Sequence, residues 1–176
     1  MKKIVFFLAG WLLSWPVFAV DGVVGAGGAN RDSVKVARLA AWWDSDWIWM
    51  AAPTRPLHLY WEANASYWSS DPGQSGNDAL WEVGFTPVLR MPLPANSGPQ
   101  TYIEGGIGAH LISETEIEDI DLSSAFHFGS LIGIGMLLDQ GRLDVGLRLQ
   151  HLSNAGIVQP NHGIDLLLLR IGRRLP

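Results

Sequence analysis

A short segment near the C-terminus, LRLQHLSNAGIVQPNHGIDLLLL, places three polar side chains among leucines. They are His151, Ser153 and Asp165. A serine becomes an effective nucleophile when a base accepts its proton, and the base needs an acceptor that fixes its tautomer and stabilises its cation. These three residues can supply nucleophile, base and orienting acid, so the chemistry would be that of a serine hydrolase.

The strands that carry these residues decide whether they can meet. In a strand expected over residues 143–154, His151 and Ser153 continue the odd-numbered face that is otherwise leucine and valine. In a strand expected over 163–174, Asp165 shares its face with leucines. A hairpin that closes symmetrically puts His151 opposite Asp165, and directly opposed residues have Cβ atoms about 4.5–5.5 Å apart. We therefore expect the imidazole to lie between the hydroxyl and the carboxylate.

The rest of the chain shows the same alternation of apolar and polar residues with a period of two. It predicts eight strands, over residues 22–29, 34–43, 57–68, 78–90, 101–112, 125–138, 143–154 and 163–174. Eight is the smallest even number of strands in bacterial outer-membrane barrels, and strands of about 10 residues fit the length of the chain. The sequence therefore predicts an all-β fold, an eight-stranded antiparallel transmembrane β-barrel.

The two faces of the predicted strands differ in character. One is apolar, and the other carries charges of both signs: Glu62, Glu82, Glu104, Arg90, Arg148 and Arg170. A soluble barrel turns its apolar face inward, whereas a transmembrane barrel turns it toward lipid around a polar lumen. Aromatic residues near strand ends favour the second arrangement, because they resemble an interfacial girdle: Trp42, Trp43, Trp47, Trp49, Tyr67 and Trp68. A soluble, lipocalin-like lipid carrier of the periplasm is the alternative.

The N-terminal residues predict export. Lysines at positions 2 and 3 precede an apolar run and the small-residue site Val17-Phe18-Ala19, which is typical of a signal peptide over residues 1–19. The apolar run is too short to span a bilayer as a helix. We expect residues 20–176 to form one barrel domain of the cell outer membrane, with several membrane passes and the three polar residues at the outer leaflet.

Composition excludes several kinds of chemistry. Without the two lysines of the predicted signal peptide, 10 basic residues stand against 17 acidic ones, a net charge of −7, so nucleic acid is not an expected partner. The absence of cysteine excludes disulfides, thiolate nucleophiles and cysteine-ligated zinc. His58, His110 and His127 fall on the lumen side, where we expect hydrogen bonding rather than metal binding. We expect neither a metal nor another cofactor.

The segment RLQHLSNAGIVQPNHGID resembles the C-terminal signature of the lipid A 3-O-deacylase family. Members of this family are eight-stranded outer-membrane barrels that hydrolyse the acyl ester at position 3 of lipid A. The resemblance implies that Ser153 is the nucleophile and His151 the base. It also implies that lipopolysaccharide is the substrate and that other outer-membrane lipids surround the protein.

The resemblance extends to the residues that follow Ser153. It implies an oxyanion hole formed by Asn154 with the backbone amides of Ala155 and Gly156, a role for donors that face developing negative charge. Asn161 matches a loop asparagine of the family. Two features depart from the family: its acidic residue is usually glutamate where this chain has Asp165, and the chain ends RRLP without an aromatic residue.

The sequence thus predicts an outer-membrane serine esterase that acts on lipid A. A structural or adhesive barrel without catalytic activity is the alternative from another class. The acidic run over residues 114–121 predicts a solvated surface loop, and divalent cations shared with lipopolysaccharide phosphates are a second interpretation of it. The oligomeric state is left open, a homodimer included.

Overall fold

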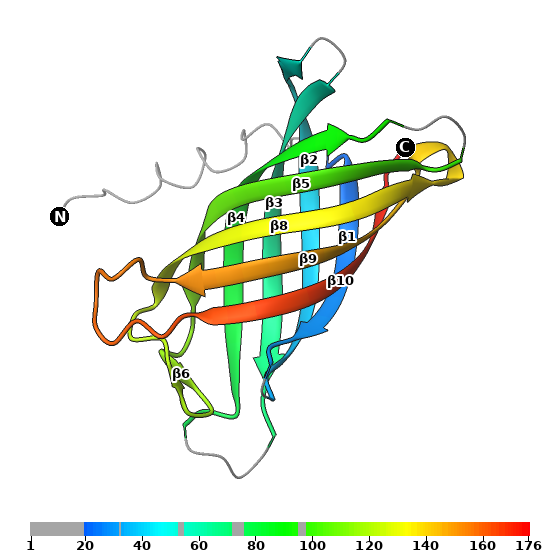
Figure 1. Cartoon of the computed structure of the whole chain (residues 1–176). Coiled ribbons are helices and arrows are strands. Elements are labelled where there is room, and N and C mark those ends of the chain that lie inside the picture. Colours follow the sequence, from blue (N-terminus) through cyan, green and yellow to red (C-terminus); the bar gives the residue numbers. More distant parts are fainter. Residues whose placement is uncertain (1–19, 32, 53–54, 72–75, 95–97) are drawn as a thin grey trace, which may run out of the picture.

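A closed antiparallel β-barrel makes up most of the chain (Figure 1). The computed structural model describes residues 20–31, 33–52, 55–71, 76–94 and 98–176, so the predicted signal peptide lies outside the described residues. The wall strands are β1 (Gly22–Ala29), β2 (Lys35–Ala52), β3 (Arg55–Ser69), β4 (Ala79–Pro92), β5 (Gln100–Ile112), β8 (Phe126–Leu138), β9 (Leu143–Ser153) and β10 (Ile164–Arg174). Around the wall they follow the order β1, β10, β9, β8, β5, β4, β3, β2.

The eight predicted strands are confirmed, and seven of them agree with the structure to within two residues at each end. The exception is β2, predicted to end at residue 43, which continues to Ala52. Its pairing with β3 shifts register between Asp44 and Ile48. A bulge of this kind breaks the two-residue alternation on which the prediction depended. Trp47 and Trp49 consequently lie within β2.

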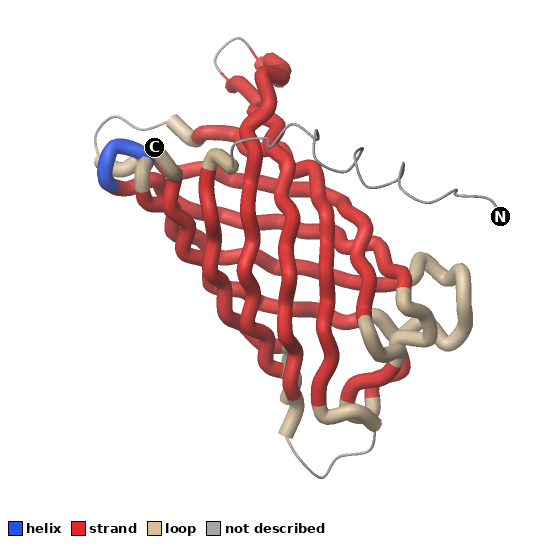
Figure 2. Tube along the Cα trace, turned by 180° about the vertical axis from the view of Figure 1, so that it is seen from behind, coloured by secondary structure: helices blue, strands red, loops and turns tan. Residues whose placement is uncertain are grey.

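The two ends of the barrel differ in the length of their connections. At one end β8 and β9 are joined by the short 3₁₀ turn η1 (Asp139–Gly141), as predicted for the segment DQGR. At the other end the connections from β5 to β8 and from β9 to β10 form an extended group of loops (Figure 2). Long loops mark the extracellular side of outer-membrane barrels and short turns mark the periplasmic side. The extracellular loops gather at the lower left of Figure 1.

Charged side chains fill the middle of the barrel, as the sequence predicts. Arg148 donates hydrogen bonds to Glu62 at 2.6 Å and to Glu104 at 2.9 Å. Nearer the extracellular end, Arg38 donates to Glu82 at 3.1 Å. All of these side chains are buried. These ion pairs join wall strands across the interior of the barrel.

An apolar cluster closes the extracellular end of the interior, which the alternation did not predict. Its buried members are Val34, Val36, Trp68, Leu80, Ile112, Ile117, Leu122, Leu152, Ile164, Leu166 and Leu168. Ile117 belongs to a small hairpin, β6 (Glu116–Ile117) and β7 (Ile120–Asp121), within the acidic run. The expectation of a fully solvated loop is therefore wrong for part of this run. Glu118 is buried and accepts a hydrogen bond from the Ser33 hydroxyl.

Most outward side chains of β9 and β10 are large and apolar. Leu147, Leu149, Leu167, Leu169 and Ile171 are all exposed on the wall, the arrangement expected of a barrel that faces lipid. No helix among the described residues is long and apolar enough to cross a bilayer. Side chains fill the interior of the barrel. A substrate could therefore reach the polar residues of the C-terminal hairpin only from the outer surface.

Candidate active site

His151 and Asp165 form a hydrogen-bonded pair on the outer surface of the barrel. The two residues are direct partners across β9 and β10, which confirms the predicted register. His151 Nδ1 lies 2.7 Å from Asp165 Oδ1. A carboxylate only accepts hydrogen bonds, so Nδ1 carries the proton. The side chains are 47% and 83% exposed, and the other ring nitrogen, Nε2, is therefore the one left for proton transfer.

Ser153 lies on the same outward face of β9, two residues beyond His151. It is half-buried, and its cross-strand partner is Phe128 of β8. Neither the Ser153 hydroxyl nor His151 Nε2 forms a hydrogen bond with another described residue. The structure thus brings His151 and Asp165 into contact and places Ser153 beside them without a direct bond.

The loop after Ser153 is held together by Asn154, which is fully buried. Its side-chain amide donates to the Val158 carbonyl at 3.0 Å, and its Oδ1 accepts from the Gly156 amide at 2.9 Å. Asn161 Oδ1 accepts a hydrogen bond from the Asn154 backbone amide at 3.1 Å. Of the expected oxyanion donors, only the Ala155 amide makes no hydrogen bond with a described residue.

Two residues beside His151 were not predicted from the sequence. Ser130 of β8 is its cross-strand partner on the side away from Asp165. Gly163 has a φ of +62°, and a Cβ there would lie 2.9 Å from His151 Cε1. Ser130 could have been found, because it interrupts an apolar face. The proximity of Gly163 depends on the conformation of the loop, which no periodicity reveals.

Two of the three predicted lumen histidines make internal hydrogen bonds, and the third, His58, makes none with a described residue. His110 Nδ1 lies 2.6 Å from Glu82 Oε1, and His127 Nε2 donates to the Ser124 carbonyl at 2.7 Å. Within the described part of the chain, no group of three or more His, Cys, Asp or Glu residues could hold a metal ion. The expectation that the site needs no metal or cofactor stays a prediction.

The fold defines an outer-membrane β-barrel, and His151, Ser153 and Asp165 lie on its lipid-facing wall. The profile of the lipid A 3-O-deacylase (PagL) family matches residues 35–174. The chain belongs to this family. A solved relative, the crystal structure of the outer membrane enzyme PagL, superposes with a TM-score of 0.79 at 33% identity, over 88% of this chain and 99% of that one.

Two curated relatives carry the name lipid A deacylase PagL. The protein of Pseudomonas aeruginosa is 36% identical over 143 residues, which are 81% of this chain and 80% of that protein. The protein of Bordetella bronchiseptica is 42% identical over 113 residues, which are 64% of this chain and 60% of that protein.

Proposed function

We propose that this chain is a lipid A 3-O-deacylase, a serine esterase that hydrolyses the acyl ester at position 3 of lipid A in the outer leaflet. The observation that carries the proposal is the 2.7 Å contact between His151 and Asp165 beside Ser153. These polar residues lie on the outward face of β9 and β10, where most other side chains are leucines. Polar and ionisable groups on a lipid-facing surface are costly to maintain, and such groups usually serve a function. The names of the family and of its relatives supply the substrate.

In the first half of the reaction, Ser153 Oγ attacks the ester carbonyl while His151 Nε2 accepts its proton. Asp165 keeps Nδ1 protonated and stabilises the imidazolium that forms. The tetrahedral intermediate then collapses, and His151 returns the proton to the departing sugar oxygen. The products of this half are the free 3-hydroxyl of the sugar and an acyl group esterified to Ser153.

In the second half, water replaces the sugar as the attacking group. His151 accepts a proton from the water, the hydroxide adds to the acyl carbonyl, and collapse returns the proton to Ser153 Oγ. The acyl chain leaves as a free fatty acid. The overall change is therefore one ester and one water converted to one alcohol and one carboxylic acid, with no other reagent.

The oxyanion would be stabilised by donors from the loop after Ser153. The Ala155 amide makes no hydrogen bond with a described residue, so it can donate to the oxyanion without first breaking one. The Gly156 amide and the Asn154 side chain would first have to leave their acceptors inside the loop. We therefore assign Asn154 and Asn161 a second role: they hold the loop in the shape that presents Ala155.

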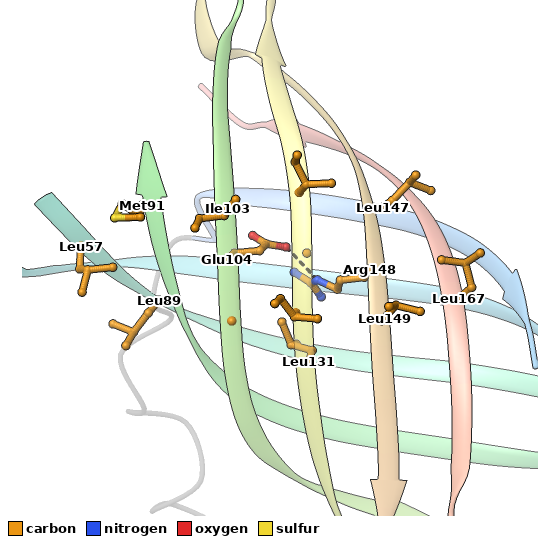
Figure 3. A pocket seen from close by; sticks show the side chains of 14 residues that line it. Leu57, Leu89, Met91, Ile103, Glu104, Leu131, Leu147, Arg148, Leu149 and Leu167 are labelled. Atoms are coloured by element: carbon orange, nitrogen blue, oxygen red, sulfur yellow. Dashed lines mark hydrogen bonds and ion pairs between the residues drawn. The ribbon is translucent and has the colours of Figure 1, made fainter. Parts of the chain in front are cut away.

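An apolar groove on the outside of the wall extends from the site and suits an acyl chain. Four of its residues, Leu149, Ile132, Gly105 and Leu89, follow one row of paired residues across β9, β8, β5 and β4. Figure 3 shows leucines and Ile103 along this groove, with the Glu104–Arg148 ion pair behind them. Its volume is about 760 Å³. A chain attached at Ser153 could lie in it without leaving the membrane.

The decisive experiment is mass spectrometry of lipid A from a host whose lipid A is acylated at position 3. Expression of this chain should lower the mass by one acyl group, and Ser153→Ala and His151→Ala should each abolish the change. Ser70→Ala, at the extracellular rim outside the site, is the matched control and should behave as wild type. Unchanged activity in Ser153→Ala would exclude Ser153 as the nucleophile. Unaltered lipid A with well-folded wild-type protein would favour a structural or adhesive barrel.

A further inference from the structure

A hollow on the outer wall lies where β2 departs from its regular pairing with β3. The register shifts between Asp44 and Ile48, and within this bulge Ser45 Oγ accepts a hydrogen bond from the Trp47 backbone amide at 3.0 Å. The hollow beside the bulge has a volume of about 770 Å³. It is lined by Trp43, Asp44, Ser45, Asp46, Trp61 and Phe85. The proposed reaction uses none of these residues.

The contacts of Asp44 place the hollow at the periplasmic border of the membrane. Asp44 Oδ2 pairs with Arg174 at 2.7 Å, and the Asp44 backbone amide donates to Asp21 Oδ2 at 2.8 Å. Asp21 lies directly before β1 and Arg174 is the last residue of β10, at the end of the barrel opposite the extracellular loops (Figure 1). These contacts fix the start of the bulge, so the hollow faces the inner leaflet near its headgroups.

The lining of the hollow changes from aromatic to acidic toward the periplasm. Trp61 and Phe85 stack with ring centroids 5.5 Å apart, and both are exposed on the wall. Trp61 pairs with Trp43 across β2 and β3. Since β2 runs toward the periplasm, Asp44 and Asp46 lie beyond these rings. An amphiphile with acyl chains toward the membrane centre and a polar headgroup at the border matches this order.

Asp46 supplies a negative charge that the protein does not neutralise. The carboxylate of Asp44 is paired with Arg174, whereas the exposed side chain of Asp46 makes no hydrogen bond or ion pair with another described residue. Among the described residues, no lysine or arginine lines the hollow. A carboxylate attracts a cation, and so does the face of a tryptophan ring. The hollow therefore suits a cationic headgroup group and would repel an anionic one.

We propose that this hollow binds an inner-leaflet phospholipid whose headgroup carries a primary ammonium, phosphatidylethanolamine. Its ammonium would donate hydrogen bonds to the Asp46 carboxylate beside the tryptophan rings, and its acyl chains would extend over Phe85. The site is distinct from the proposed active site, because β3 and β9 are four strands apart in either direction around the wall. Binding there does not require the proposed esterase activity.

The test is native mass spectrometry of the folded protein in detergent, titrated with phosphatidylethanolamine or phosphatidylglycerol of identical acyl chains. Wild-type protein should bind phosphatidylethanolamine about fivefold more tightly, the effect of one ion pair and one cation–π contact at a partly exposed site. Asp46→Asn keeps the shape and removes the charge, so the preference should fall to near one. Asp46→Lys should reverse it. Asp78→Asn is the matched control, because Asp78 is exposed at the extracellular rim and its side chain has no described partner.

Equal binding of the two lipids by wild-type protein would overturn the inference. It also fails if Asp46→Asn or Asp46→Lys keeps the preference for phosphatidylethanolamine. A loss of preference in Asp78→Asn as large as in Asp46→Asn would overturn it too, since net charge and not the hollow would then select the lipid. The mobility difference between boiled and unboiled protein on a gel verifies that each variant forms the barrel. Lipid A deacylation is assayed separately, so the proposed function stands or falls independently of these results.

Discussion

Ser123 and Pro160 join two extracellular loops that are distant in the sequence: the Ser123 hydroxyl donates a hydrogen bond to the Pro160 carbonyl oxygen. Close by, the Asn154 side-chain amide donates to the Leu122 carbonyl at 3.5 Å. Leu122 is 1% exposed and belongs to the same apolar cluster as Leu152 of β9. The loop between β5 and β8 therefore supports the loop that carries the proposed oxyanion donors.

Leu122→Ala should weaken both the fold and the activity. Removing a buried leucine side chain costs about 2–5 kcal/mol when the cavity does not collapse, and here the cavity would open under the loop after Ser153. Leu39→Ala is the matched control, because Leu39 is 74% exposed on the wall. Urea titration in detergent micelles and deacylation at equal amounts of folded protein would measure the two effects. Equal unfolding midpoints for the two variants would contradict this role of Leu122.

Strand alternation was enough to predict the wall and the His151–Asp165 pair, because a slip of one residue would turn every leucine of β9 to the wrong side. The same reasoning failed at Asp44, where a bulge interrupts the alternation. It could not predict the bond between Ser123 and Pro160, since contacts between loops follow no period. Strand alternation also could not predict the hydrogen bonds made by Asn154, because they depend on how the loop folds back on itself.

Gly163→Ala should lower kcat by displacing His151. A Cβ at position 163 would lie 2.9 Å from Cε1 and 3.3 Å from Nε2 of the imidazole. A displacement of about 1 Å can reduce catalysis by about 100-fold. Gly141→Ala is the matched control, because Gly141 also has a positive φ, +88°, but a Cβ there would meet no atom within 4 Å.

Both glycine variants should lose about 1–2 kcal/mol from the left-handed backbone, and Gly163→Ala should lose somewhat more, because its Cβ would lie 3.0 Å from the Leu152 carbonyl oxygen. Only Gly163→Ala should lose activity. Steady-state kinetics and unfolding midpoints of both proteins would be compared. Equal kcat values for the two variants would show that the imidazole does not need the space beside Gly163.

Arg148→Met should destabilise the barrel without impairing the chemistry of the folded protein. The change leaves Glu62 and Glu104 buried without the cation that donates to both. Removing one partner from a buried ion pair costs about 3–5 kcal/mol. Lys35→Met is the control, because Lys35 pairs with Asp71 at the surface and its side chain is 67% exposed; such pairs contribute about 0–1 kcal/mol. A similar urea midpoint for both variants would argue against a structural role for the interior network.

Asp165 is one of the two features in which the sequence departs from the family resemblance, which implies a glutamate at this position. Asp165→Asn removes the charge that stabilises the imidazolium, and in the serine-protease triad the corresponding change lowers kcat by about 10⁴-fold. We expect a severe loss here as well. Asp165→Glu keeps the charge and adds one methylene at an exposed position, where no core packing opposes it, so this variant should retain substantial activity.

Moving the carboxylate by one residue provides the sharpest test of the outward-facing site. Ile164 is 4% exposed and points into the barrel, because side chains alternate between faces along a strand. In an Asp165→Ala background, Ile164→Asp should therefore restore nothing, although it returns a carboxylate to within one residue of its original place. Deacylation would be measured for all variants at equal amounts of folded protein. Full activity in Asp165→Asn would remove Asp165 from the triad, and activity in the shifted variant would mean that the reaction does not take place on the lipid-facing surface.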